Sequence, residues 1–179
     1  MPRAQPRLRL IEGQGQTLDP PVSIDSAFRR WAPYVGGIVQ RLLGPGADVD
    51  DLVQDVFVDA VRGIDNLRDP DAMRAWLTTI AVRRVRRRLG RQRLRHLFRF
   101  ETAEVPDPAL SPEKKLALRD AYRVLDRVKP AERIAWILRH VEGEGLVDVA
   151  RICGCSRATA HRRIAAVEAA FAKEFRDER

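Results

Sequence analysis

The residues best suited to chemistry in this sequence are arginines, and many of them lie in one stretch. Between positions 83 and 99 the arginines follow one another with no acidic residue among them: Arg83, Arg84, Arg86, Arg87, Arg88, Arg91, Arg93, Arg95 and Arg99. Guanidinium groups bind phosphates through paired hydrogen bonds and stay charged at physiological pH. A solvated helix face usually mixes charges of both signs. The stretch therefore predicts a surface that binds a polyanion.

The charge of the whole chain favours nucleic acid as that polyanion. The 179 residues carry a formal net charge of +8, and the pI is about 10.4. The positive excess falls in two blocks, one before residue 100 and one after residue 114, with an acidic segment between them. A membrane surface is disfavoured, because no predicted helix pairs a basic face with a large exposed apolar one.

The side chains do not favour catalysis, a metal site or a cofactor. His96, His140 and His161 are scattered, and no nucleophile, glycine-rich phosphate loop or metal cluster is visible. Cys153 and Cys155 are too few for zinc and poorly spaced for a disulfide, which indicates reduced thiols in the cytoplasm. We expect neither a membrane-spanning helix nor a secretory signal, because the apolar runs are too short.

A second candidate nucleic-acid surface lies near the C-terminus. Ala150 stands four residues before Gly154, and Ser156 can then cap a longer helix, which is the spacing of a helix-turn-helix. The small residue lets two helices approach closely, and glycine tolerates the left-handed turn. The predicted buried residues are Leu146, Val149, Ala150, Cys153, Ala160, Ile164, Val167, Phe171 and Phe175. A helical hairpin that serves only as scaffold is the alternative.

The front of the second of these helices is the part that would enter a major groove. Its polar residues lie outside the apolar stripe or at its edge: Ser156, Arg157, Thr159, His161, Arg162 and Arg163. Arginine bound to guanine through two hydrogen bonds is the commonest specific base contact. Arg157 and Arg162 are therefore the strongest candidates for reading bases.

A helix predicted from about Val49 to Gly63 carries an acidic face. Asp51, Asp55 and Asp59 recur every four residues, and like charges at that spacing cost about 0.2–0.5 kcal/mol per pair in an isolated helix. We interpret this face as directed at a basic partner, with an ordinary acidic surface as the alternative. A metal site is disfavoured, because carboxylates about 6 Å apart along one helix do not converge on one ion.

Helical periodicity predicts an all-α protein of two small helical domains. We expect a flexible tail over 1–22, a three- to four-helix bundle over 23–97, an extended linker over 98–114 and a helix-turn-helix domain over 115–179. The first helix should be capped by Asp25 or Ser26, kink or restart at Pro33, and end at 44–46. A later helix should open with Asp69 as its cap and Pro70 at its first position. Its predicted buried face is Met73, Trp76, Leu77, Ile80, Ala81 and Val85.

The second domain should begin with two further helices. Ser111 and Pro112 would open the first, with Leu118, Ala121, Tyr122, Leu125 and Val128 on its inner face. Pro130 would open the second, and the residues predicted to point inward are Ile134, Ile137, Leu138 and Val141. A turn is predicted over 142–145.

Three short motifs in this order resemble the extracytoplasmic-function group of sigma factors of bacterial RNA polymerase. They are Asp50-Asp51-Leu52-Val53-Gln54-Asp55-Val56-Phe57, then Trp76-Leu77-Thr78-Thr79-Ile80-Ala81, then Glu142-Gly143 followed by 146–164. Each motif is weak alone, and their order and distances make the resemblance strong. It covers about residues 23–95, the family's region 2, and 115–175, its region 4.

The resemblance implies partners and roles for these residues. Core RNA polymerase, through its β′ clamp and β subunit, would bind Asp51, Leu52, Gln54, Asp55, Phe57 and Asp59. The −10 element of promoter DNA would be opened and bound by Asn66, Arg68, Arg74, Trp76, Arg83, Arg84, Arg86, Arg87 and Arg88. The −35 element would be read by the helix-turn-helix residues named above, Ser156 to Arg163. An anti-sigma factor is a further expected partner.

A stand-alone helix-turn-helix regulator that binds operators as a dimer is the alternative function. The acidic face separates the two hypotheses, because such a regulator has no use for it. Reversing the charge of Asp51, Asp55 and Asp59 should abolish polymerase binding by a sigma factor and leave DNA binding by a regulator unchanged.

Overall fold

Seven α-helices and one short 3₁₀-helix make up the described parts of the computed structural model, which are residues 24–45, 47–64, 67, 69–95 and 110–176. The predicted tail, most of the predicted linker, and Asn66 and Arg68 lie outside these ranges. The helices are α1 Ile24–Leu43, α2 Asp50–Gly63, η2 Pro70–Ala72, α3 Met73–Arg95, α4 Pro112–Arg127, α5 Pro130–His140, α6 Leu146–Cys153 and α7 Arg157–Glu174. The predicted all-α class is confirmed.

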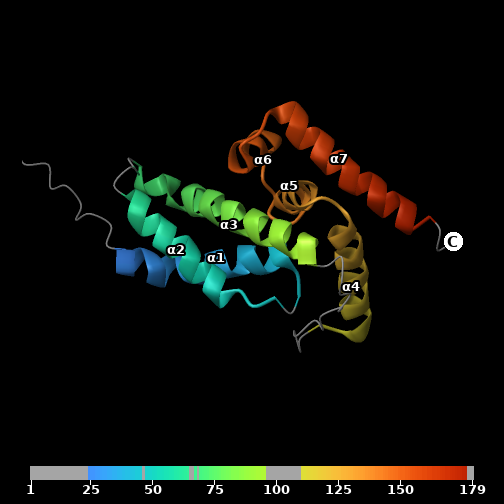
Figure 1. Ribbon diagram of the computed structural model, residues 1–179, viewed down its shortest axis with the longest axis horizontal. Helices are drawn as coiled ribbons and strands as arrows, with labels where there is room; N and C mark the ends of the chain where they lie inside the picture. The colour runs from blue at the N-terminus through green and yellow to red at the C-terminus, as the bar shows by residue number, and fades with distance from the viewer. Residues whose placement is uncertain (1–23, 46, 65–66, 68, 96–109, 177–179) are drawn as a thin grey trace, which may run out of the picture.

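Helices α1, α2 and α3 pack against one another and form the N-terminal unit (Figure 1). The apolar faces that meet include Val35, Leu42, Val56, Leu77 and Val85, each almost completely buried. Burying side chains of this size contributes about 1.5–3 kcal/mol each. The predicted face of α3 is confirmed for five of its six residues, and Trp76 is half-buried.

The sequence predicted that α1 would kink or restart at Pro33, and the restart was wrong. The helix starts at Ile24, ahead of the expected caps, and remains one element through Pro33 to Leu43. Proline removes one hydrogen bond of the helix ladder. The residues that follow Pro33, including Val35, Ile38, Val39 and Leu42, are buried at 1% exposure or less. Tertiary packing of this face therefore outweighs the local preference of the proline.

The entry into α3 follows the predicted cap, with a tighter first turn. The backbone N–H of Asp71 donates to Asp69 Oδ1 at 2.9 Å, and the N–H of Ala72 donates to the Asp69 carbonyl. Residues Pro70–Ala72 form the 3₁₀ turn η2 before α3 begins at Met73. Short 3₁₀ turns are frequent at helix starts, so the prediction was right about the cap and wrong about the type of the first turn.

Helices α4 to α7 form the C-terminal unit. Ser111 caps α4 by accepting a hydrogen bond from Lys114 N, and Pro112 and Pro130 occupy the first positions of α4 and α5, as predicted. The sequence placed Val141 and Phe175 inside, which was wrong: they follow the last residues of α5 and α7 and are 50% and 44% exposed. Beyond a helix end, the 3.6-residue period no longer fixes the direction of a side chain.

The helix-turn-helix has the predicted geometry. Gly154 follows α6 with φ 62° and ψ 48°, in the left-handed region, and Ser156 caps α7 by accepting a hydrogen bond from Thr159 N at 3.2 Å. Ala150 is 5% exposed where α6 meets α7. Glycine adopts a positive φ without the clash that a Cβ atom would cause. The turn therefore directs the front of α7 away from the core.

The two units pack directly on each other. Helices α5 and α6 contact α3, and α5 also contacts the end of α1, so α5 lies between α3 and α7 (Figure 1). Their buried residues form one continuous hydrophobic cluster. The sequence predicted two helical bodies and did not predict how they meet. No described helix combines the length and apolar content needed to cross a membrane.

Candidate functional site

The arginine-rich part of α3 presents a basic surface along the described part of that helix. Arg83, Arg87 and Arg91 are exposed, whereas Arg88 is half-buried. Arg86 is exposed and its Nη1 donates to the Cys153 carbonyl of α6 at 3.4 Å. Arg83 and Arg87 therefore expose their guanidinium groups to an outside anion, and so does Arg91, although its Nε donates to the Arg87 carbonyl at 3.3 Å. The side chains of Arg93 and Arg95, and the whole of Arg99, lie outside what the structure describes.

The start of α3 holds an aromatic and a cation in contact with α1. The Arg74 guanidinium lies 5.0 Å from the centre of the Tyr34 ring, and a hydrogen bond of 2.9 Å links Tyr34 Oη to Thr78 Oγ1. Trp76 lies against Gly63, where an added Cβ would be 3.2 Å from its ring. Arg74 is exposed and Trp76 half-buried, so a ligand can reach both. A cation above an aromatic ring is favourable, so this contact holds the Arg74 guanidinium against Tyr34.

The acidic face of α2 is a ridge of exposed side chains supported by buried ones. Asp51, Gln54 and Asp55 are exposed along the helix. Leu52 and Phe57, also predicted to bind a partner, are each 5% exposed and belong to the core. They position the ridge and are not on its surface, because period 3.6 turns them toward α1 and α3. Val58 and Val61 add exposed apolar area to α2.

The acidic ridge already has a basic partner inside the molecule. Arg84 Nε and Nη2 donate to Asp59 Oδ2 and Oδ1 at 2.6 and 2.5 Å, and Nη1 donates to Asp55 Oδ2 at 3.1 Å. The bond to Arg84 lowers the pKa of Asp59, and the bond to Asp59 raises the pKa of Arg84. Arg84 therefore relieves the repulsion between the carboxylates of Asp55 and Asp59. The other polar residues of the ridge, Asp51 and Gln54, do not bind Arg84.

The front of α7 presents polar side chains on one side of the helix. Arg157, His161 and Arg162 are exposed, whereas Thr159 and Arg163 are half-buried. Ser156 Oγ lies 2.9 Å from Thr159 Oγ1 and accepts the capping bond, so these two hydroxyls hold the helix start. The structure thus divides the predicted −35 residues into three that face outward and three that face the molecule or cap the helix.

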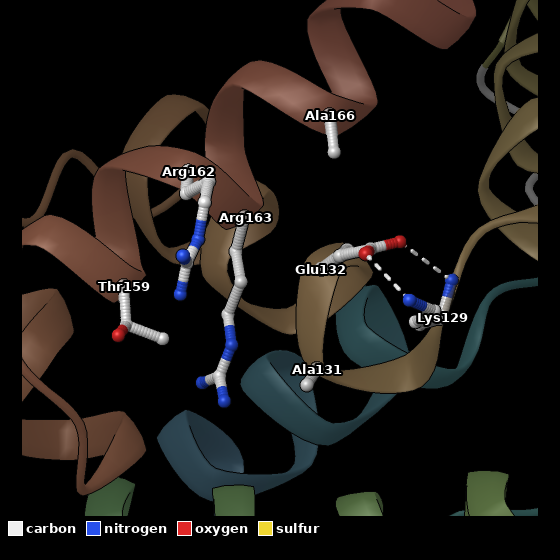
Figure 2. Close-up of a pocket in the computed structure, with 7 residues that line it drawn as sticks. All are labelled: Lys129, Ala131, Glu132, Thr159, Arg162, Arg163 and Ala166. Carbon is white, nitrogen blue, oxygen red and sulfur yellow. Dashed lines mark hydrogen bonds and ion pairs between the residues drawn. The ribbon is translucent and has the colours of Figure 1, made fainter.

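A hollow of about 470 Å³ separates α7 from the start of α5. Figure 2 shows Arg162 and Arg163 extending into it from α7, with Glu132 bound to Lys129 on the opposite wall. The Lys129 N–H donates to Glu132 at 2.9 Å, which closes the capping box of α5. The arginines have no acidic partner among the hollow-lining residues other than this occupied carboxylate, so the hollow favours anions.

Four residues at the junction of the two units were not predicted as functional. They are Arg41 on α1, Tyr122 on α4, Arg133 on α5 and Glu142 in the turn before α6. Arg133 is 3% exposed and binds backbone carbonyls at the end of α1. One signal was present in the sequence. Arg133 stands four residues before the buried Ile137, so a charged residue occupies the apolar stripe of α5.

The cysteines are free thiols with different surroundings. Cys153 is buried and Cys155 half-buried. Burial raises the pKa of the Cys153 thiol to about 11, which keeps this thiol protonated near neutral pH. Among the residues that the structure describes, no three His, Cys, Asp or Glu side chains gather in a way that could hold a metal ion.

Comparisons with known proteins place this geometry in a family. Residues 27–95 match the family model described as Sigma-70 region 2. The chain is 30% identical over 133 residues to RNA polymerase sigma factor NccH of Alcaligenes xylosoxydans xylosoxydans, across 70% of this chain and 72% of that protein. It is 27% identical over 148 residues to the ECF RNA polymerase sigma-E factor of Escherichia coli K12, across 75% and 77% of the two chains.

Solved structures share the arrangement of helices. The sigma factor RpoE, crystallised with the anti-sigma factor NepR from Bartonella quintana, superimposes with a TM-score of 0.66 across 87% of this chain and 98% of that chain, at 24% identity. CnrH, in complex with the cytosolic domain of CnrY, gives a TM-score of 0.60 across 87% and 89%, at 23% identity. At these identities the likeness shows the fold alone. From the relatives and the region 2 match together, the chain belongs to the extracytoplasmic-function sigma factors of the sigma-70 family.

Proposed function

We propose that this protein binds core RNA polymerase, directs it to specific promoters and melts their −10 region. The observation that carries the proposal is the presence, in one chain, of an acidic ridge on α2 and two separate outward-facing arginine surfaces, on α3 and α7. A promoter-specificity subunit needs three such contacts: one to the enzyme and one to each promoter element. The protein would contribute binding and leave the chemistry to the polymerase.

The polymerase would bind the exposed part of the α2 ridge. Asp51 and Gln54 are free of Arg84, and Val58 and Val61 provide apolar area on the same helix. Charge complementarity speeds encounter and suppresses wrong partners, whereas buried apolar contact supplies much of the affinity. A basic surface on the β′ clamp would match this ridge, and the β subunit would be reached from the C-terminal unit.

The −10 element would be bound at α3 while its DNA duplex opens. Extruding a base from a duplex costs a few kcal/mol, and stacking a base on an aromatic ring returns about 1–3 kcal/mol. Trp76 would offer such a ring near the start of α3, and Arg74, Arg83 and Arg87 would offer charges to the DNA backbone along the helix. Asn66 and Arg68 remain predicted contacts in the preceding loop.

The −35 element would be read in the major groove by the front of α7. Arg157, His161 and Arg162 face outward and are the proposed base contacts. Arg162 and Arg163 both line the hollow beside α5, but Arg163 is half-buried and is better placed for a backbone phosphate. Phosphate contacts fix the register of a helix on DNA, and base contacts give it sequence preference.

A pull-down with core RNA polymerase tests the proposal. Asp51→Lys should abolish or strongly reduce capture by core enzyme, because it reverses the charge at the free part of the ridge. Asp71→Lys is the matched control, since Asp71 is also an exposed acid in the first turn of a helical segment. If the unmodified protein does not bind core polymerase, or if Asp51→Lys binds as well as Asp71→Lys, the proposal is wrong.

A further inference from the structure

The hollow between the front of α7 and the start of α5 contains two arginines that the fold does not use. Arg162 and Arg163 extend into it from α7 (Figure 2). Neither arginine forms an ion pair or a side-chain hydrogen bond with another residue of the described part of the chain. Both guanidinium groups are therefore available to a ligand that enters the hollow.

Arg163 differs in this respect from the other shielded arginines of the C-terminal unit. Arg133 is buried and pairs with Asp126. Arg123 is half-buried, and its Nη1 lies 2.8 Å from Asp120 Oδ1. Arg163 is the third described arginine of this unit that is not exposed, and it has no acidic partner there. A charge that is partly removed from water without a counter-ion is unfavourable, and a bound anion would supply the missing partner.

The opposite wall of the hollow carries one acid, and that acid is already bound. Lys129, Ala131 and Glu132 form this wall at the start of α5. Both oxygens of Glu132 are engaged by Lys129, one by its backbone N–H at 2.9 Å and the other by Nζ at 3.8 Å. This pairing limits the repulsion that an incoming anion would meet. The positive end of the α5 dipole adds to the attraction from the two arginines.

Small side chains keep the hollow open and set the size of its ligand. Ala131, Thr159 and Ala166 line it beside the charged residues. Its volume of about 470 Å³ falls within the range of roughly 300–1,000 Å³ that is usual for small-molecule sites. A single phosphate group occupies a small part of such a volume. A chain of phosphates fits better, because each of the two arginines can bind a phosphate through paired hydrogen bonds.

We propose that the hollow binds a free compound with a di- or triphosphate chain, held by Arg162 and Arg163 against the start of α5. The same two arginines are proposed contacts to the −35 element, so the bound compound would compete with promoter DNA for α7. This competition rests on the proposed function, whereas binding of the compound does not. Nucleotides and inorganic phosphate chains share the required chemistry, and the experiment distinguishes between them.

An amide NMR titration of the full chain with inorganic triphosphate tests the site. Binding in the hollow should shift the backbone amide signals of Ala131, Thr159 and Ala166 until they saturate. Sodium sulfate at equal ionic strength is the control for salt effects. Saturable shifts that are confined to the arginine-rich part of α3, or the same shifts with sulfate, would overturn the proposal.

Two alanines of α7 provide a matched pair of variants. Ala166→Leu fills the hollow without changing its charge, and Ala165→Leu adds the same side chain at the preceding residue, which does not line the hollow. Both alanines are exposed, so both variants should fold, and circular dichroism verifies this. Ala166→Leu should weaken triphosphate binding by about tenfold or more, and Ala165→Leu should leave it unchanged.

A charge variant tests the same site independently of how leucine packs. Arg163→Met keeps an unbranched side chain and removes the charge, so it should also weaken triphosphate binding by about tenfold or more. Equal dissociation constants for the unmodified protein, Ala166→Leu and Arg163→Met would show that the ligand binds elsewhere, and the proposal would be wrong.

A comparison of ligands identifies the source of the phosphate chain. Orthophosphate should bind about tenfold more weakly than triphosphate, because it cannot reach both arginines, and equal affinity would overturn the claim of a chain. Tighter binding of adenosine triphosphate than of inorganic triphosphate would identify a nucleotide as the ligand, and equal binding would identify the phosphate chain alone; either result supports the site. The titration contains neither DNA nor polymerase, so failure of the proposed function would leave its result unaffected.

Discussion

Arg84 binds Asp59 through both oxygens of the carboxylate, at 2.6 and 2.5 Å, and so joins α3 to α2. One arginine of the basic stretch is therefore a structural residue. Its neighbour Arg83 is exposed. The sequence alone could not separate the two, because both belong to the same run of guanidinium groups. Arg83 and Arg84 therefore provide a matched test of which arginines stabilise the folded protein.

Arg84→Ala should lower the free energy of unfolding by about 1 kcal/mol. The change removes a half-buried ion pair and restores the repulsion between Asp55 and Asp59. Arg83→Ala should change it by less than about 0.5 kcal/mol, as expected for an exposed side chain. Urea unfolding followed by circular dichroism gives both values. Equal losses would show that Arg84 does not stabilise the contact between α2 and α3.

The contribution of Asp59 should depend on pH. Its pKa lies below the ordinary value of 3.8 because of the bond to Arg84, so the stabilisation is present above that value and is lost as the pH falls through the lowered pKa. Asp59→Asn should therefore destabilise the protein fully at pH 7, and its effect should shrink progressively as the pH falls below 3.8 toward the lowered pKa. Unfolding curves over this range provide the test, and a difference that stays constant from pH 7 to pH 3 would contradict it.

The exposed arginines of α3 should matter more for promoter opening than for polymerase binding. Arg83→Ala combined with Arg87→Ala removes two charges proposed to contact the DNA backbone, and the logarithmic salt dependence of DNA binding should fall by about one per arginine. Permanganate reactivity of unpaired thymines measures opening, and pull-down measures polymerase binding. Arg119→Ala, an exposed arginine on α4, is the control. Equal losses in both assays would refute the assignment to the −10 element.

Two arginines of α7 should have different roles. Arg157→Ala should weaken binding by about 1–3 kcal/mol and relax selectivity at one promoter position. Arg163→Ala should weaken binding to all sequences alike, because Arg163 is half-buried at the hollow beside α5 and is proposed to contact a phosphate. Transcription from a promoter library with each variant separates these outcomes. Uniform loss for Arg157→Ala would reassign that residue to a phosphate.

Gly154 should be required for its backbone conformation alone. It has φ 62°, and a Cβ atom added there would have no other atom within 4 Å. A side chain at this position would therefore strain the backbone but would not clash with neighbouring residues. Gly154→Ala should cost about 1–2 kcal/mol, whereas Gly154→Asn should cost less because asparagine tolerates this region better. Thermal unfolding of the two variants measures the difference. Equal costs would mean that the turn rearranges.

The sequence was sufficient to predict those elements whose capping and turn residues agree with the way the helices pack. The helix-turn-helix was predicted because Ala150, Gly154 and Ser156 each have a separate physical reason for their position. It was insufficient where distant parts of the chain meet. The bond between Arg84 and Asp59 and the burial of Arg133 both depend on how helices pack, and no local pattern specifies that. The predicted restart of α1 at Pro33 was wrong for the same reason.

Because α3 is one uninterrupted helix, the distance between the residues at its two ends is fixed. Trp76 and Arg91 belong to one helix, so they are separated by about 22 Å along its axis. Duplex DNA rises about 3.4 Å per base pair, so this separation equals about six to seven base pairs. A single residue inserted between them would rotate the later arginines by about 100° around the axis. The same insertion between α3 and α4 would leave the spacing of Trp76 and Arg91 intact.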